Sequence, residues 1–271
     1  MHAINAETYR EKYGPWAVIT GASDGTGAAY ARELAAIGIN LVLIARRPEP
    51  LAALAQELES AHTIQTRTVS IDLYQPDAAA RVVAAADGLE VGLFVSNAGA
   101  DPNGSRFLDA PLSAWRDLIQ RNVSVVMEAT YTFAKAMVAR RRGGIILMSS
   151  GTALGGQAGT AIYCGTKAFD LNMGESLWIE LQPFDVDVLA VVSPAMDTPS
   201  LQTLLSRNNL TVPGLYHPAD VARKALEWLP DGPTIIFPFG PEAARIPEIE
   251  SARRERARVM SEATKMFFGD K

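Results

Sequence analysis

The stretch Thr20-Gly21-Ala22-Ser23-Asp24-Gly25-Thr26-Gly27 decides the fold, because its three glycines stand between two regular patterns. Residues 16–20 before it are an apolar run of strand length, and the apolar residues after it recur at helical spacing over 25–37. A strand, a tight turn and a helix N-terminus in this order direct backbone N–H groups and the positive end of the helix dipole toward a diphosphate. Glycines that only make a sharp turn are the alternative, so this prediction needs support from elsewhere in the chain.

The alternation of short apolar runs and longer amphipathic segments continues along the chain. Runs typical of buried strands cover residues 16–20, 39–45, 64–71, 91–96, 144–148, 186–192 and 234–237. Helical patterns cover residues 25–37, 51–61, 76–86, 111–142, 161–182 and 218–229. Repeated units of this kind predict an α/β fold, a Rossmann-type doubly wound parallel sheet of about seven strands with helices on both faces.

Composition sets the domain count and limits the partners. The 271 residues are 48% hydrophobic and carry a net charge of −5, which fits one domain over 1–271. Residues 240–271 form a charged, amphipathic extension, which we interpret as a docking or oligomer helix or as a disordered tail. The acidic balance argues against a nucleic-acid partner, since phosphate binding usually needs many convergent cations.

Membrane and metal functions also find no support in the sequence. No run approaches the roughly 20 apolar residues of a spanning helix, and residues 1–13 have no apolar stretch of signal-peptide length. We therefore expect no membrane span and a cytoplasmic location. The lone Cys164 cannot form an intrachain disulfide, and the three histidines lack metal-ligand spacing. We expect no metal site.

The end of the second apolar run indicates which dinucleotide the turn would hold. This run ends in Ala45-Arg46-Arg47, near the place where a dinucleotide fold meets the adenosine ribose. An acidic residue at Ala45 would bind a free 2′-hydroxyl, whereas guanidinium groups suit a 2′-phosphate by charge and geometry. We predict NADP(H) as the cofactor, with Arg46 a better candidate than Arg47. An exposed basic loop is the alternative.

Three polar residues farther along form a candidate catalytic group. Tyr163 and Lys167 are four residues apart in a helical pattern and therefore share one face. A phenol has a pKa of about 10, and a nearby ammonium favours its phenolate form and lowers that value. Ser150 follows a predicted strand and can donate a hydrogen bond to a carbonyl oxygen. The pattern favours acid–base chemistry on a carbonyl or an alcohol.

Taken together, the motifs make the chain resemble the short-chain dehydrogenase/reductase family across nearly its whole length. The matching residues are Thr20, Gly21, Gly25 and Gly27 of the turn, Asn97-Ala98-Gly99, Asn122, Ser150, Tyr163 and Lys167. The amino-acid sequences at residues 13–20, 89–92 and 149–151 resemble those of the branch that contains 17β-hydroxysteroid dehydrogenases and 3-ketoacyl-CoA reductases.

The resemblance implies a role for each matching position. Asn122, Ser150, Tyr163 and Lys167 would be catalytic. The cofactor would be bound by Gly21, Ser23, Asp24, Gly25, Thr26, Gly27, Arg46, Arg47, Asp72, Leu73, Asn97, Ala98, Gly99, Tyr163, Lys167, Pro194, Ala195 and Thr198. Ser150 and Tyr163 would polarise the carbonyl, Tyr163 would donate the proton, and Asn122 would hold a water-linked relay to Lys167. The family also implies a homodimer or homotetramer and a small carbonyl or alcohol substrate.

The chain departs from the family pattern at three places. Thr26 replaces the usual isoleucine, and Ser96 replaces the first asparagine of a doubled motif. In Pro194-Ala195-Met196-Asp197-Thr198 an alanine replaces a glycine, and the threonine comes one position early. Ala195 adds a methyl group where the backbone normally approaches the nicotinamide, which puts the roles of Ala195 and Thr198 in question.

Substrate information should lie in three variable stretches, residues 100–110, 152–162 and 198–216. The last stretch is rich in leucine, a pattern compatible with a lid over an apolar ligand and equally with core packing or a subunit contact. We therefore expect an oxidoreductase that interconverts a hydrophobic ketone or aldehyde and an alcohol. One alternative is a catalytically silent NADP(H)-binding sensor or scaffold with the same fold, and another is a lipid-surface protein that uses its C-terminal helix.

Overall fold

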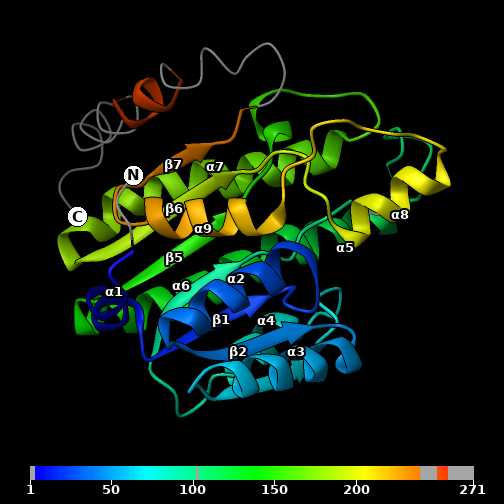
Figure 1. Ribbon diagram of the computed structural model, residues 1–271. Coiled ribbons are helices and arrows are strands. Elements are labelled where there is room, and N and C mark those ends of the chain that lie inside the picture. The colour runs from blue at the N-terminus through cyan, green and yellow to red at the C-terminus, as the bar shows by residue number, and fades with distance from the viewer. Residues whose placement is uncertain (1–3, 102–103, 239–248, 256–271) are drawn as a thin grey trace.

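The computed structural model describes residues 4–101, 104–238 and 249–255. In this part of the chain, parallel strands form a seven-stranded sheet in the order β3-β2-β1-β4-β5-β6-β7 (Figure 1). The strands are β1 (Trp16–Thr20), β2 (Asn40–Ala45), β3 (Thr66–Ser70), β4 (Val91–Ser96), β5 (Gly143–Met148), β6 (Val186–Val192) and β7 (Thr234–Ile236). This arrangement confirms the predicted doubly wound parallel sheet.

Helices cover both faces of the sheet (Figure 1). They are α1 (Ala6–Tyr13), α2 (Gly25–Ile37), α3 (Pro48–Ala61), α4 (Ala78–Ala84), α5 (Leu112–Ile119), α6 (Val125–Arg140), α7 (Ala161–Leu181), α8 (Pro199–Arg207) and α9 (Pro218–Trp228). Short turns lie at Gln120–Ser124, which is π-helical, and at Gly151–Leu154 and Gln182–Phe184, which are 3₁₀-helical.

The two faces of the central strands point into different cores. Ala17 and Ile19 of β1 belong to the core under α2, α3 and α9, whereas Val18 belongs to the core under α4, α6 and α7. Side chains alternate in this way because successive residues of a strand point to opposite faces of the sheet. A strand buried on both faces is therefore apolar throughout, which is why strands such as β2 and β4 are visible in the sequence as continuous apolar runs.

The chain order reverses at β1, which pairs with β2 on one side and with β4 on the other. In open α/β sheets a ligand crevice forms at such a point, outside the carboxyl ends of the strands. The glycine-rich turn follows β1, and Asn97 follows β4. The topology thus places both predicted cofactor segments at one edge of the sheet.

Three helical features differ from the sequence prediction. The segment 111–142 is not one regular helix, because the π-turn Gln120–Ser124 interrupts it between α5 and α6. Helices α1 and α8 were not predicted. Both have a side-chain N-cap: Asn5 accepts hydrogen bonds from the backbone N–H groups of Glu7 and Thr8, and Thr198 from that of Leu201. Neither apolar periodicity nor length made these short helices apparent.

The described part of the C-terminal extension, residues 249–255, is helical and lies beside β7. Glu250 Oε1 accepts a hydrogen bond of 2.7 Å from the backbone N–H of Ile236. Arg253 binds Glu175 of α7, with Nη2 3.1 Å from Oε2. For these residues a docking helix is the better interpretation; residues 240–248 and 256–271 lie outside the described ranges.

Among the helices of residues 4–101, 104–238 and 249–255, none has the length and apolar character that a membrane span requires.

Candidate active site

The glycine-rich turn is shaped by backbone that side chains would obstruct. Gly21 and Gly25 have φ angles of 69° and 52°, in the left-handed region. A Cβ atom at Gly27 would lie 2.0 Å from the carbonyl oxygen of Gly21, so only glycine fits there. Asp24 is the N-cap of α2 but makes no side-chain capping bond. The turn is therefore a cradle formed by main chain at a helix N-terminus, as diphosphate binding requires.

Asn97 joins this turn to the end of β4. Its Nδ2 donates to the carbonyl oxygens of Thr20 and Gly21, at 3.1 and 3.2 Å. In return, Thr20 Oγ1 accepts from the backbone N–H groups of Asn97 and Ala98, at 3.1 and 3.2 Å. These four bonds hold the ends of β1 and β4 in register across the crevice.

The two arginines after β2 differ in what they contact. Arg47 forms an ion pair with Asp24 of the glycine-rich turn. Arg46 is exposed, and its backbone carbonyl accepts from Ser70 Oγ at 2.9 Å. It is thus Arg47 that reaches the turn, although the sequence favoured Arg46; the role of each in binding a 2′-phosphate stays a prediction.

The predicted adenine-side residues follow β3. Asp72 Oδ1 accepts from the backbone N–H of Tyr74 at 3.2 Å, and Leu73 is buried. Asp72 therefore shapes its own turn and stands at the same edge of the sheet as the glycines. Contact of Asp72 and Leu73 with a cofactor stays a prediction.

The loop after β6 folds back against the glycine-rich turn. Thr26 Oγ1 lies 3.2 Å from Met196 Sδ. A Cβ atom at Gly25 would lie 3.1 Å from Cγ2 of Thr198, whose Oγ1 caps α8 at 3.3 Å from Leu201 N. Pro194 is buried and Ala195 is half-buried. Thr198 therefore stands beside the turn, but its hydroxyl is already used as an N-cap.

Tyr163 and Lys167 lie in the first two turns of α7, as their spacing predicts. Lys167 is 3% exposed, and its Nζ lies 6.0 Å from the centroid of the Tyr163 ring. The ammonium donates to the carbonyl of Met148, at the end of β5, at 2.7 Å. A Cβ atom at Gly99 would come within 2.7 Å of Nζ, so the missing side chain at Gly99 makes room for the ammonium. Tyr163 itself is half-buried.

Two serines follow β5, and only one is left half-exposed. Ser149 is buried, and its Oγ donates to the carbonyl of Lys167 at 2.7 Å. Ser150 is half-buried and starts the 3₁₀ turn Gly151–Leu154, which packs against α7; its Oγ accepts from Thr152 N at 3.3 Å. The Ser150 proton therefore remains available to a ligand, whereas the Ser149 hydroxyl is used within the protein.

Asn122 lies in the π-turn and is fully buried beside α7. Its Nδ2 donates to Thr166 Oγ1 at 3.2 Å, and its Oδ1 lies 3.6 Å from the Cβ position built on Gly99. A π-turn widens the helix locally and frees backbone groups, and such turns are frequent at functional sites. The turn therefore places Asn122 beside the same Gly99 backbone that Lys167 approaches.

Sequence reasoning missed two charged residues near this group, Arg121 and Asp170. Burial lowers the pKa of Arg121, whose guanidinium binds Tyr74 Oη at 2.6 Å, Asn122 Oδ1 at 2.9 Å and the carbonyl of Ala100. Asp170 Oδ2 lies 2.9 Å from Lys167 Nζ. Asp170 could have been found from the sequence, because it follows Lys167 by three residues in a helical pattern and therefore lies on the same face. No local pattern in the sequence indicates that Arg121 is buried.

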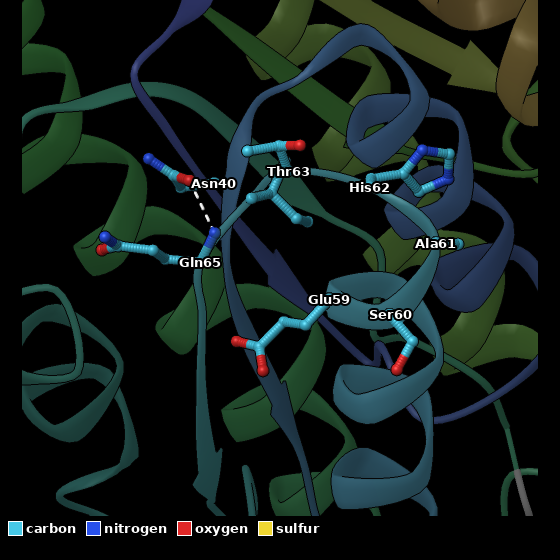
Figure 2. Close-up of a pocket in the computed structure, with 8 residues that line it drawn as sticks. Asn40, Glu59, Ser60, Ala61, His62, Thr63 and Gln65 are labelled. Carbon is cyan, nitrogen blue, oxygen red and sulfur yellow. Dashed lines mark hydrogen bonds between the residues drawn. The ribbon is translucent and has the colours of Figure 1, made fainter.

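A surface hollow of about 510 Å³ lies at the opposite end of the strands, away from these groups. Figure 2 shows its lining, at the end of α3 and the starts of β2 and β3, with Asn40 accepting a hydrogen bond from the backbone of Gln65 at 2.8 Å. It contains none of the predicted site residues, and we assign it no catalytic role. Among the described residues, no acidic, histidine or cysteine side chains form a group able to hold a metal ion.

Comparison with known proteins decides the family. The short chain dehydrogenase family model matches residues 15–209, well over half of the chain. The chain belongs to the short-chain dehydrogenase family. Members of this family are oxidoreductases that act on CH–OH or C=O groups with a nicotinamide cofactor, so the predicted enzyme class is confirmed.

The relatives of this short-chain dehydrogenase include hydroxysteroid enzymes. It is 34% identical over 194 residues to a 7beta-hydroxysteroid dehydrogenase of Mediterraneibacter gnavus, covering 72% of this chain and 73% of the relative. It is 34% identical over 207 residues to human 17-beta-hydroxysteroid dehydrogenase type 3, covering 76% and 66%. These matches confirm the branch of the family that the three short segments indicated.

A solved structure supports the same placement. A short-chain dehydrogenase from Sphingobium yanoikuyae in complex with NADPH has a TM-score of 0.78 to this short-chain dehydrogenase at 29% identity. The match covers 92% of this chain and 96% of that one. At this coverage the similarity extends over nearly the whole fold.

Proposed function

We propose that this protein is an NADP(H)-dependent oxidoreductase that interconverts a bulky hydrophobic ketone or aldehyde and the matching alcohol. The observation that carries the proposal is the assembly at the carboxyl edge of the sheet. Tyr163 lies in the same helix as Lys167, and Ser150 heads a turn that packs against that helix. The glycine-rich turn stands at the same edge, after β1.

The residues present fit a dinucleotide. A Cβ atom at Gly27 would lie 2.0 Å from the carbonyl oxygen of Gly21, and one at Gly99 would lie 2.7 Å from Lys167 Nζ, so main chain without side chains lines these places. Bound nicotinamide would supply or accept a hydride at the carbonyl carbon. The diphosphate would be held by the turn, and Lys167 would meet the nicotinamide ribose.

The protein's own groups then handle the proton and the carbonyl oxygen. Ser150 Oγ donates a hydrogen bond to that oxygen, and Tyr163 Oη gives it a proton during reduction or takes one during oxidation. The Lys167 ammonium, 6.0 Å from the ring centroid, favours the phenolate that forms during reduction. Asn122 supports the route by which this proton is replaced.

NADP(H) is favoured over NAD(H) by the residues after β2. Ala45 offers no carboxylate to a 2′-hydroxyl, and Arg46 and Arg47 offer two guanidinium groups to a 2′-phosphate. Arg47 already binds an anionic group of the turn, the carboxylate of Asp24. The NADPH complex of the similar Sphingobium protein adds support.

A hydrophobic substrate is favoured by the lid segment and by the relatives. Leu204 of α8 is 48% exposed, and Leu210 just after it is 60% exposed. Such side chains would find apolar contacts on a bulky ligand. Two of the similar proteins are hydroxysteroid dehydrogenases, so steroids are the first substrate class to test.

The deciding experiment follows NADPH oxidation with steroid ketones, aromatic ketones, 3-ketoacyl thioesters and sugars, and repeats each assay with NADH. We expect turnover of at least one steroid or bulky aromatic ketone and a preference for NADPH. No turnover of any carbonyl, together with tight NADPH binding, would favour the silent sensor or scaffold instead. That alternative requires the glycine-rich turn but gives no reason for Ser150, Tyr163 and Lys167 to be brought together.

Assembly and location are part of the proposal. We propose a homodimer or homotetramer, because apolar side chains are exposed along α5 and α6. These are Leu112, Ile119, Met127 and Tyr131, with 58%, 42%, 48% and 70% of their surface exposed. Light scattering of the purified protein would test the mass of the assembly. We propose a cytoplasmic location on the sequence argument.

A further inference from the structure

Asp170 is a buried carboxylate that the proposed chemistry does not use. It lies one helical turn after Lys167 on α7, and the side chains of Lys167 and Asp170 are 4% and 3% exposed. Asp170 Oδ2 lies 2.9 Å from Lys167 Nζ, whose other bond goes to the carbonyl of Met148 at 2.7 Å. An ammonium has three donors. Protein groups therefore hold two of them, and the third is left for the active-site side.

Apart from Lys167, few groups offset the burial of the Asp170 carboxylate. Its second oxygen, Oδ1, is buried without a hydrogen-bond partner among the described residues. Burial raises the pKa of Asp170, and Lys167 is the charged group that opposes this effect. The Lys167 ammonium is therefore the charged partner that compensates this buried carboxylate.

The charged groups that face this region from neighbouring elements are few. Arg121 of the π-turn is close enough to interact with Tyr163, and also with Asp101 and Tyr74. The other charged residues on elements that pack against α7 are Arg116 and Asp117 of α5, which are exposed, and Asp187 of β6, which pairs with Lys12. Farther along α7, Glu175 pairs with Arg253 and Glu180 is exposed.

We propose that Asp170 is a positioning residue that anchors the Lys167 ammonium and partly cancels its electric field at Tyr163. The proposal rests on the proposed function, since it assumes that Tyr163 exchanges the proton. A carboxylate 2.9 Å from Nζ converts a single positive charge into an ion pair, and the field of a pair falls off faster with distance. Its effect on a ring centred 6.0 Å from Nζ is correspondingly smaller.

The consequence is a bias in the protonation of the site. With its ammonium partly neutralised, Lys167 stabilises the phenolate less than a free lysine in the same place. The protonated phenol is the form that can donate to a carbonyl, so the Lys167–Asp170 pair adapts the site to carbonyl reduction near neutral pH.

The test is the pH profile of Asp170→Asn in both reaction directions, with the best ketone of the substrate panel and its alcohol. Removal of the carboxylate leaves the Lys167 charge uncompensated and stabilises the phenolate. Reduction requires the phenol and declines as pH rises, whereas oxidation requires the phenolate and declines as pH falls. We expect both limbs to move to lower pH by about one unit.

Three further variants separate charge from structure. Asp170→Val also removes the charge and carries the same test if Asp170→Asn does not fold. Asp170→Glu keeps the charge and should keep the wild-type pH profile even where kcat falls. The matched control is Glu175→Gln, on the same helix, 6% exposed and paired with Arg253. This control should lose stability without any shift of the profile.

Each outcome has a distinct meaning. Profiles of Asp170→Asn and Asp170→Val that coincide with the wild type would overturn the role of Asp170 while leaving the proposed function intact. A shift in Asp170→Glu as large as in Asp170→Asn would overturn the explanation by charge. A wild-type protein that reduces no ketone of the panel would instead overturn the proposed function.

Discussion

The glycine-rich turn and the surroundings of Lys167 stand at the same edge of the sheet but are built differently. The turn is made by backbone, with Gly21 and Gly25 in the left-handed region and no space for a side chain at Gly27. The Lys167 site is made by buried charge, with Asp170 and the carbonyl of Met148 around one ammonium. Backbone geometry leaves a local trace in the sequence, whereas charge compensation depends on partners that only the fold brings together.

The largest effect is expected from Tyr163→Phe, which removes the proton donor and little else. We predict a loss of about a hundredfold to ten-thousandfold in kcat, the usual range for positioned acid–base groups. NADPH affinity, measured by fluorescence titration, should stay close to that of the wild type. A variant that retained most of its kcat would show that the chemistry does not depend on the Tyr163 hydroxyl.

The turn is tested by Gly27→Ala. Its Cβ atom would lie 2.0 Å from the carbonyl oxygen of Gly21, so the backbone must move. We predict a destabilisation of about 1–3 kcal/mol, typical of overpacking, and a weaker NADPH affinity. Thermal unfolding with and without NADPH measures both. Unchanged affinity would mean that the turn is structural only.

A smaller effect is expected on the preference for NADPH over NADH when Arg46 or Arg47 is replaced. Arg46→Ala and Arg47→Ala each remove one guanidinium, and a lost charge-assisted bond of about 1.5 kcal/mol corresponds to about a tenfold loss of preference for NADPH over NADH. The ratio of kcat/KM for the two cofactors measures it. We expect NADH activity to remain, and a ratio unchanged in both variants would contradict the assignment to a 2′-phosphate.

The smallest effect is expected from Gly165→Ala, the matched control for Gly27→Ala. Gly165 lies within α7, and apart from its neighbours along the helix no atom of the described residues lies within 4 Å of its Cβ position. Alanine is favoured over glycine inside a helix, so we predict a gain of about 0.5–1 kcal/mol in the free energy of unfolding. Chemical denaturation measures it. A loss of stability comparable to that of Gly27→Ala would remove the contrast between the two positions.

The same contrast explains how much of the fold the sequence predicted. The helix over 25–37 and the strands at 16–20, 91–96 and 186–192 agree with the structure at both ends, because burial on both faces of a strand leaves an unbroken aliphatic run. The interruption at Gln120–Ser124 was missed, since a single π-turn hardly disturbs the apolar pattern of a long helix. Helices α1 and α8 are short and were assigned to no element.

The candidate site divides in the same way. Tyr163 and Lys167 could be placed on one helical face from their spacing alone, and Ser150 from its position after a strand. Asn122 and Arg121 are adjacent in sequence, yet nothing local indicates that the guanidinium of Arg121 is buried against Tyr74 and Ala100. Burial of a charge is a property of the assembled layers.

Ser149 links α7 to the sheet. Its hydroxyl donates a hydrogen bond of 2.7 Å to the carbonyl of Lys167, and its own carbonyl accepts one of 2.9 Å from Ser193 Oγ. These two bonds connect α7 with the ends of β5 and β6. None of these bonds involves residues 198–216. Residues 198–216 can therefore vary, or be exchanged to admit a ligand of another shape, while α7 keeps Tyr163 in the same position relative to the sheet.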